Sequence, residues 1–574
     1  ALDGNTTAVN NVAIGYACLG ASQTGNNNTG VGTYTFEDNT TGAENTALGY
    51  FALGNNTTAS NNVAVGAYAL STSTTGGSNC AVGYKALEDA TGSWNTAIGD
   101  LAMTNTTTGH NNVAIGHQAM DDVQTGTHNV AIGVNSLGSA TNASQNVAIG
   151  QLALYATTTG NYNAAVGYYA LAANETGSKN TAVGYKALDA NTTAWNNVGI
   201  GNEALGSNTT GDQNTAVGAY ALDDNETASE NTGLGYNALT DNTTGAHNTA
   251  VGHDALENLT TGSYNTAMGR DAGRNITTGA GNVCLGSNAN DAANNAGNVA
   301  VGTFALSGNE ADYGTAVGYY ALRLNSTGAG NVAVGYLALE ENTTASENTA
   351  IGWKSLRINT TGAANTAVGA FSLDSNQTAS NNTGVGHVAL AGNTTGGNNT
   401  AVGKDALALN TTGGDNTALG SHSLASNTTA SYNTAVGQAA LNSNQTGTGN
   451  TAVGQGCLRG NTTGNNNTAM GTNALDACTT SVSNVCIGQS AGGAISTGNG
   501  ENVCVGNNCG ALMTTGQQNV FIGDNAGAGN VVTGASNTCV GDNAGYAITS
   551  SSYNNAFGAT ALDSATTGTV NIAL

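Results

Sequence analysis

Proline is absent from this chain of 574 residues, and only 8 % of the residues are charged and 5 % aromatic. Ten lysines and arginines stand against 35 aspartates and glutamates, which gives a net charge of −25. Binding to nucleic acid is therefore excluded, because phosphate contacts need clustered cations. Insertion into a membrane is also not expected, since no segment approaches the roughly 18 consecutive apolar residues that a spanning helix needs.

What the chain does contain is a repeat. Asparagine, threonine, alanine and 84 glycines dominate, yet apolar residues reach 39 %, too many for a simply disordered polar tract. The glycine of an "AVG"-like triplet occurs 33 times from Gly15 to Gly558, and 27 of the 32 intervals are 17 residues long. Such a short, constant period predicts a solenoid in which each repeat is one coil.

Numbered from its asparagine, the unit reads N-[TV]-A-[VIL]-G-x-x-A-L-x-x-N-T-T-G-x-x. Below, a column is the set of residues that share one of these 17 positions. Columns 2 to 4 predict a short strand, with β-branched and aliphatic residues at 2 and 4 facing the interior. The predicted fold is an all-β parallel β-solenoid (β-roll) of about 33 coils. Stacking at ~4.8 Å per coil would make a rod of roughly 160 Å.

Column 3 lies on the opposite face of the same strand. It holds Ala, Gly or Cys in every unit except the one with Phe521. If columns 2 and 4 face inward, so strict a size limit at column 3 indicates packing against another chain or a second layer. The other interpretation is low diversity after recent duplication. We therefore predict a homo-oligomer, a trimer, that associates through the column-3 alanine face.

Three segments carry a resemblance to a known family: "NNVAIGYAC" (10–18), "NNVAVGAYA" (61–69) and "NNVAIGHQA" (111–119). They resemble the head repeat N-S-V-A-I-G-x-x-S of YadA-type trimeric autotransporter adhesins, which is similar to repeats in phage tail fibres. The resemblance implies a left-handed β-roll in a trimer, on an extracellular or surface-displayed rod. The unit here is longer by an added N-T-T-G segment.

The chain is expected to contain two regions. Residues 1–470 hold regular 17-residue repeats, and residues 471–574 hold divergent repeats that continue the same rod. In the second region "AL" becomes "AG" at Gly492, Gly527 and Gly545. Both ends are cut mid-repeat, so we expect an excerpt of a longer polypeptide.

Two columns consist largely of asparagine. Column 1 predicts a ladder of stacked side chains. Column 12 meets the N-x-T acceptor rule for N-glycosylation, although Asn-Thr-Thr-Gly is also good turn chemistry. Shifted copies of this acceptor occur at Asn105, Asn258 and Asn275. The candidate glycosylation sites in column 12 are Asn5, Asn39, Asn56, Asn174, Asn191, Asn208, Asn225, Asn242, Asn325, Asn342, Asn359, Asn376, Asn393, Asn410, Asn427, Asn444 and Asn461.

No residues predict catalysis, a metal site or a cofactor. Most of the nine cysteines replace small residues in columns 3 and 8, as buried hydrophobes would, although Cys486 and Cys504 could cross-link adjacent coils. Paired carboxylates such as Asp121 and Asp122 fall at outward corners without a predicted cleft. The seven histidines lack metal-ligand or triad spacing. The chain is not expected to be an enzyme.

The predicted function is a non-enzymatic extracellular structural fibre or adhesin shaft. Its N-x-T loops could carry glycans, and its partners could include a cell-surface or glycan ligand. The alternative is an ice-binding or other surface-binding solenoid, because regular threonine columns on a flat sheet can order water. Against that alternative, columns 2 and 4 are predicted to face the interior, so the column-2 threonines would not reach an ice surface.

Overall fold

The computed structural model describes residues 4, 6–292, 294–498, 500–564 and 568–574. Across these residues the chain is an all-β parallel solenoid of about 33 turns, and they contain no helix. The chain divides into two compact units, residues 1–287 and 288–574. Each unit has 17 strands, and each is described by itself below.

Every strand but the last covers columns 2 to 4 of one repeat. In the first unit the strands are β1 (Val12–Ile14), β2 (Thr29–Val31), β3 (Thr46–Leu48), β4 (Val63–Val65), β5 (Cys80–Val82), β6 (Thr96–Ile98), β7 (Val113–Ile115), β8 (Val130–Ile132), β9 (Val147–Ile149), β10 (Ala164–Val166), β11 (Thr181–Val183), β12 (Val198–Ile200), β13 (Thr215–Val217), β14 (Thr232–Leu234), β15 (Thr249–Val251), β16 (Thr266–Met268) and β17 (Val283–Leu285).

In the second unit the strands are β18 (Val299–Val301), β19 (Thr315–Val317), β20 (Val332–Val334), β21 (Thr349–Ile351), β22 (Thr366–Val368), β23 (Thr383–Val385), β24 (Thr400–Val402), β25 (Thr417–Leu419), β26 (Thr434–Val436), β27 (Thr451–Val453), β28 (Thr468–Met470), β29 (Val485–Ile487), β30 (Val503–Val505), β31 (Val520–Ile522), β32 (Thr538–Val540), β33 (Asn555–Phe557) and β34 (Ile572–Ala573).

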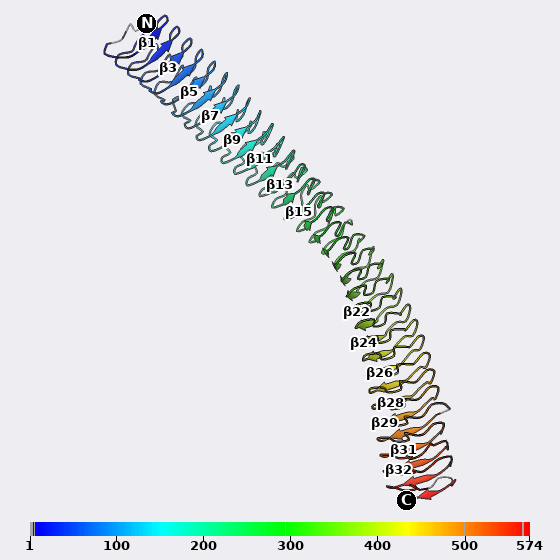
Figure 1. The fold of residues 1–574 in the computed structure, drawn as a ribbon. Helices are drawn as coiled ribbons and strands as arrows, with labels where there is room; N and C mark the ends of the chain where they lie inside the picture. Colours follow the sequence, from blue (N-terminus) through cyan, green and yellow to red (C-terminus); the bar gives the residue numbers. More distant parts are fainter. Residues whose placement is uncertain (1–3, 5, 293, 499, 565–567) are drawn as a thin grey trace. The chain divides into compact units, whose positions relative to one another are not determined.

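Within each unit, a strand pairs in parallel with the strand of the next coil. The register matches column to column: Ala182 of β11 lies beside Gly199 of β12, and Gly199 beside Ala216 of β13. Figure 1 shows the strand arrows of successive coils side by side, each leading into a loop of the same form. Each repeat of the sequence therefore forms one coil, and equivalent positions of successive repeats lie side by side.

The corners of each coil depend on left-handed backbone conformations. Columns 7, 9 and 17 have positive φ with ordinary side chains, for example Lys186 (φ 51), Leu188 (φ 54) and Asn196 (φ 58). The column-5 glycine is at φ 140 in Gly184, and a Cβ there would overlap the Gly201 carbonyl oxygen of the next coil. This double constraint explains why column 5 is always glycine.

Backbone hydrogen bonds between coils extend far beyond the strands. In the coil 180–196, the N–H groups of Lys186, Leu188 and Asn196 donate to carbonyl oxygens of Tyr168, Ala204 and Ser178 at 2.9 to 3.1 Å. Proline has no N–H to donate, so it would interrupt this ladder at these positions. The absence of proline follows from a chain that pairs its backbone at its corners as well as in its strands.

The interior is lined by columns 1, 3, 8, 9, 12 and 15. Ala182, Ala187 and Leu188 are fully buried, and so are the asparagines Asn180 and Asn191. Columns 8 and 9 thus form a second buried segment after the glycine corner. The predicted side-chain parity of the strand is wrong: in β11 the alanine faces the interior, while Thr181 and Val183 face outward.

The parity follows from how narrow the coil is. A Cβ added at Gly199 in column 3 would lie 3.2 Å from the Leu188 side chain, so column 3 packs directly against column 9. Only a methyl group or less fits opposite leucine, which sets the size limit at column 3. The alanine is covered by its own coil and needs no neighbouring subunit, so the predicted packing of this face on another chain is also wrong.

Exceptions to the size limit are matched across the interior. Phe521 in column 3 lies opposite Gly527 in column 9, where a Cβ would approach the phenylalanine ring to 2.6 Å. The reverse exchange pairs Gly30 in column 3 with Phe36 in column 9. Cys486, Cys504 and Cys539 likewise face Gly492, Gly510 and Gly545. In the divergent repeats, where "AL" becomes "AG", the larger side chain in column 3 therefore fills the space that the column-9 leucine occupies elsewhere.

If column 3 and column 9 fill one space, a substitution in one column should restore the stability that a substitution in the other removes. Replacing Phe521 with Ala should cost about 3–5 kcal/mol of local stability because it empties the space opposite Gly527. Gly527→Leu alone should also destabilise, by overlap with the ring. The double variant Phe521→Ala/Gly527→Leu restores the regular pair and should recover most of the loss. Hydrogen exchange of peptides covering residues 500–545 measures each effect, and a double variant no better than the singles would contradict the pairing.

Candidate functional site

The most extensive exposed feature is the outer surface of the sheet. We call columns 2 and 4 together the outward sheet face. Ile14 is 60 % exposed and Leu419 46 %, and similar side chains occupy column 4 of every coil. Neither column contains a charged residue in any of the 33 units, although the chain carries a net charge of −25. An uncharged surface that combines an apolar column with threonine and valine, repeated from coil to coil within each unit, is typical of an interaction site.

Threonine occupies long runs of column 2 on this face. Eight consecutive strands, β21 to β28, each begin with threonine. Thr400 and Thr417 are exposed, and the other six are partly exposed. The sequence-based argument that these threonines point inward is therefore wrong. The eight threonines are Thr349, Thr366, Thr383, Thr400, Thr417, Thr434, Thr451 and Thr468.

The charged residues occupy the corners beside the sheet and interact with one another. Arg357 donates through Nε to Asp374 Oδ1 at 3.0 Å and lies 3.7 Å from Glu341. Arg323 pairs with Glu340 at 3.2 Å. These pairs join neighbouring coils and are partly exposed, so each contributes little to stability. Their position keeps charge off the outward sheet face.

Aromatic side chains are almost all on the surface. Among the described residues, the only aromatic side chains in the buried core are Phe36 and Phe521. In the first five coils, tyrosines in columns 6 and 7 form a continuous chain of edge-to-face contacts, with ring centroids 5.3 to 6.3 Å apart. We call this the tyrosine strip; its members are Tyr16, Tyr34, Tyr50, Tyr68 and Tyr84.

The candidate glycosylation asparagines of column 12 face the interior. Apart from Asn5, which lies outside the described residues, all 16 are fully buried. Asn191 Nδ2 donates to Asn174 Oδ1 of the preceding coil at 2.8 Å, and Asn393 Nδ2 donates to the Gly396 carbonyl at 2.9 Å. In the folded solenoid a sugar on Nδ2 would have to break this ladder. Column 1 forms the second ladder, as predicted: the Asn180 backbone N–H donates to Asn163 Oδ1 at 2.9 Å.

The sequence carried a signal for this burial that the acceptor motif obscured. Where column 12 is not asparagine, it holds no charged residue. Some units have apolar side chains such as Val123, Leu259, Ile276 and Met513, and others have the hydroxyl residues Ser22, Ser73, Thr106 and Thr157; all of these are buried. A loop tip exposed to solvent would vary toward charge instead. Cys478 stands in column 12 directly after the last asparagine of the ladder, Asn461. Its thiol donates to Asn461 Oδ1 at 3.7 Å and so ends the ladder.

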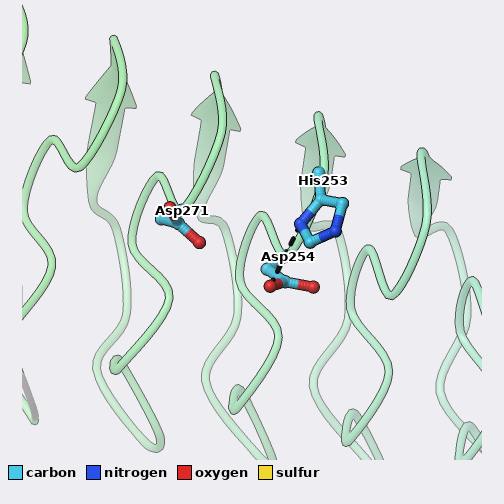
Figure 2. A group of neighbouring side chains, drawn as sticks. All are labelled: His253, Asp254 and Asp271. Atoms are coloured by element: carbon cyan, nitrogen blue, oxygen red, sulfur yellow. Dashed lines mark ion pairs between the residues drawn. The ribbon is translucent and has the colours of Figure 1, made fainter.

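One group of side chains has the composition of a metal site. His253, Asp254 and Asp271 bring a ring nitrogen and two carboxylate oxygens within 4.8 Å of one another. Figure 2 shows His253 beside Asp254 on one coil, with Asp271 on the next. The His253 Nδ1 atom lies 3.1 Å from Asp254 Oδ2.

Two arginines already compensate these carboxylates. Arg274 Nε lies 2.6 Å from Glu257 Oε2, and its terminal nitrogens lie 3.8 Å from Asp254 and 3.7 Å from Asp271. Arg270 lies 3.4 Å from Asp271 on the other side. The Glu257 carboxylate raises the pKa of Arg274, which stays charged. These contacts describe an arginine-centred ion-pair network rather than a cation site.

A second acidic group lines a shallow hollow near β12. Gly206 has no side chain, and the space beside it is bordered by Lys186, Asp189, Glu203 and Asp223. Partial burial, with the nearby Glu203 and Asp224 carboxylates, raises the pKa of Asp223 to about 6. Lys186 is the only cation in this lining. The hollow is therefore a place of uncompensated negative charge at neutral pH.

The cysteines do not form a reactive centre. All nine but Cys80 are buried, and Cys486 and Cys504 are free thiols, so the predicted cross-link between these two is not formed. Burial raises the pKa of Cys457, Cys478 and Cys539 to about 12. The nucleophilic form of cysteine is the thiolate, so these thiols are unreactive at neutral pH.

Comparison with protein-family models and with curated proteins gave no match for this chain. No helix among the described residues is long and apolar enough to cross a membrane. The resemblance of the repeat to adhesin heads therefore remains an expectation drawn from the repeat itself.

The buried ladder predicts where sugar will be absent. After expression in a glycosylating eukaryotic host, Asn393 and Asn410 should carry no glycan in the folded protein, because their amides are enclosed. The exposed acceptors Asn105 and Asn275 serve as controls for entry into the pathway. Peptide mapping by mass spectrometry measures the occupancy of each site. A glycan on the ladder asparagines of folded protein would contradict their burial.

The raised pKa of Asp223 predicts a pH-dependent effect. Because the folded-state pKa exceeds the unfolded value, the contribution of Asp223 to stability is fully present below about pH 3.8 and is lost as the pH rises through 6. Asp223→Asn should therefore slow hydrogen exchange of the segment 200–226 at pH 7.5 and change it little at pH 4. An equal effect at both pH values would rule out the titration as its cause.

Proposed function

We propose that the chain is a non-enzymatic structural rod, displayed outside the cell as part of a fibre or adhesin shaft. Copies of the chain associate side by side through the outward sheet face. The observation that carries this proposal is the uncharged surface of columns 2 and 4, in which column 4 is apolar in every coil. The resemblance to trimeric adhesin heads supports left-handed winding and a trimer as the form of association.

The partner that best fits this face is a second copy of the same chain. A copy in parallel orientation has the same rise per coil, so its aliphatic columns keep register over many coils. At ~4.8 Å per coil and a width of roughly 10 Å, the face of 17 coils covers about 800 Å². That area equals what one partner contributes to a standard-size stable interface. A partner with a different repeat would lose register within a few coils.

The buried alanine column changes how the association should be tested. Substitutions at column 3 would disturb folding, whereas substitutions at column 4 change only the outer surface. Six lysines in column 4 should raise the dissociation constant at least about 100-fold, because association would bury unpaired charges. The substituted residues are Val385, Val402, Leu419, Val436, Val453 and Met470, each changed to Lys.

The matched control places six lysines in column 14 of the same coils, where the side chains are exposed but lie off the sheet. It has the same net charge and should associate like the unmodified chain. Light scattering on a size-exclusion column and sedimentation equilibrium of the full chain measure the association. A monomeric unmodified chain, or equal weakening in both variants, would contradict the proposal. The control residues are Thr395, Thr412, Thr429, Thr446, Thr463 and Thr480, each changed to Lys.

A second candidate function is the ordering of water at an ice surface, and the eight outward threonines of β21 to β28 favour it. In this case the chain works as a monomer with a bare face, which excludes burial of the same face between copies. Thermal hysteresis should then be present in the unmodified chain, absent from the column-4 lysine variant and retained by the column-14 control. An oligomer without hysteresis supports the structural rod instead.

A further inference from the structure

The tyrosine strip is an exposed row of rings that the buried core does not need. Its rings lie outside the core, where leucine and alanine already fill the coil. Each ring contacts the rings before and after it at the same corner, Phe51 also lies against Tyr50 and Tyr68, and Lys85 Nζ lies over the Tyr84 ring. Tyr50 and Tyr68 are close enough for their hydroxyl groups to interact, which raises the pKa of Tyr50. Tyrosine rings that are exposed and held in a row are typical of a binding surface.

The strip has a period of two coils. Column 6 reads Tyr16, Thr33, Tyr50, Ala67 and Tyr84 along β1 to β5, so a large ring alternates with a small residue. Tyr16, Tyr50 and Tyr84 are 71, 45 and 48 % exposed, whereas the column-7 rings between them are half-buried. Successive exposed rings are therefore about 10 Å apart, which is twice the strand spacing.

Consecutive rings of the strip are held at defined angles. The planes of Tyr16 and Tyr34 meet at 89°, those of Tyr34 and Tyr50 at 85°, and those of Tyr68 and Tyr84 at 87°. Because each half-buried ring packs edge-to-face between two exposed ones, it limits how the exposed rings can turn. The exposed rings are thus preorganised, which lowers the entropy lost when a ligand binds.

These features restrict the ligand to an extended polymer of neutral sugars. A net charge of −25 excludes anionic chains such as nucleic acid or sulfated glycans. The repetition along the solenoid axis fits a polymer better than a compact ligand. In an extended β-linked polysaccharide every second sugar presents the same face, at a step close to the spacing of the exposed rings. Apolar C–H faces of sugars stack on aromatic rings, while their hydroxyl groups stay in water.

We propose that the tyrosine strip binds an extended β-linked polysaccharide. Tyr16, Tyr50 and Tyr84 each stack on one sugar, and the three stacked sugars are two units apart along the polymer. The polymer runs along the axis of the first unit, beside the outward sheet face rather than over it. The strip therefore binds sugar whether or not the chain self-associates, and its test is separate from that of the proposed function.

The test uses cellohexaose and chitohexaose as probes and maltohexaose, an α-linked chain that coils, as the geometric control. Calorimetric titration of the full chain should show binding of at least one β-linked hexasaccharide and none of maltohexaose. The triple variant Tyr16→Ala/Tyr50→Ala/Tyr84→Ala should weaken binding at least about tenfold. The variant Tyr16→Phe/Tyr50→Phe/Tyr84→Phe keeps the rings and should retain most of the affinity.

The matched control removes three exposed tyrosines that lie in column 17, outside the strip: Tyr162, Tyr432 and Tyr553, each changed to Ala. It should bind like the unmodified chain. Three results would overturn the proposal: no binding of either β-linked probe, equal binding of maltohexaose, or equal loss in the strip variant and the control. Circular dichroism of both alanine variants establishes that a loss of binding is not a loss of fold.

Discussion

The contact between column 3 and column 9 across the narrow interior is the constraint on which the rest of the structure depends. A coil of 17 residues encloses room for a methyl group opposite a leucine and for little else. That limit turns the alanine inward, and the alternation of a strand then turns the threonine, valine and isoleucine columns outward. The aliphatic side chains that would form the core of a larger protein are here the surface of the molecule.

Stability in such a thin structure comes largely from hydrogen bonds that repeat in every coil. The backbone ladder runs through strands and corners, and the asparagines of columns 1 and 12 extend it into the interior. A buried amide is stabilising only when its partners are in place. Exact repetition supplies those partners, because each coil presents the same groups at the same height to the next. This dependence explains the nearly constant period of the repeat and the absence of proline.

Much of the fold could be predicted from the sequence, because its period fixes the strands, the glycine corner and the buried leucine of column 9. The parity of the strand could not be predicted from residue type. Valine normally faces a core more often than alanine, and only the width of the coil reverses that preference. The acceptor motif of column 12 misled for a related reason, since Asn-Thr-Thr describes a local turn and not the direction of the asparagine. Leu259 and Ile276, which replace the column-12 asparagine in two coils, correctly indicate that this column is buried. The tyrosine strip needed the structure, because its alternation between columns 6 and 7 becomes a row only when the coils stack.

The native cysteines allow the most direct test of the central claim, because they occupy both faces of the strand. Cys80 lies in column 2, and Cys284, Cys486, Cys504 and Cys539 lie in column 3. Alkylation of folded, monomeric protein, followed by mass spectrometry of the peptides, compares the two faces within one molecule. We predict that Cys80 is labelled while the column-3 cysteines stay protected until the chain unfolds. Rapid labelling of the column-3 cysteines with Cys80 protected would contradict an inward alanine column.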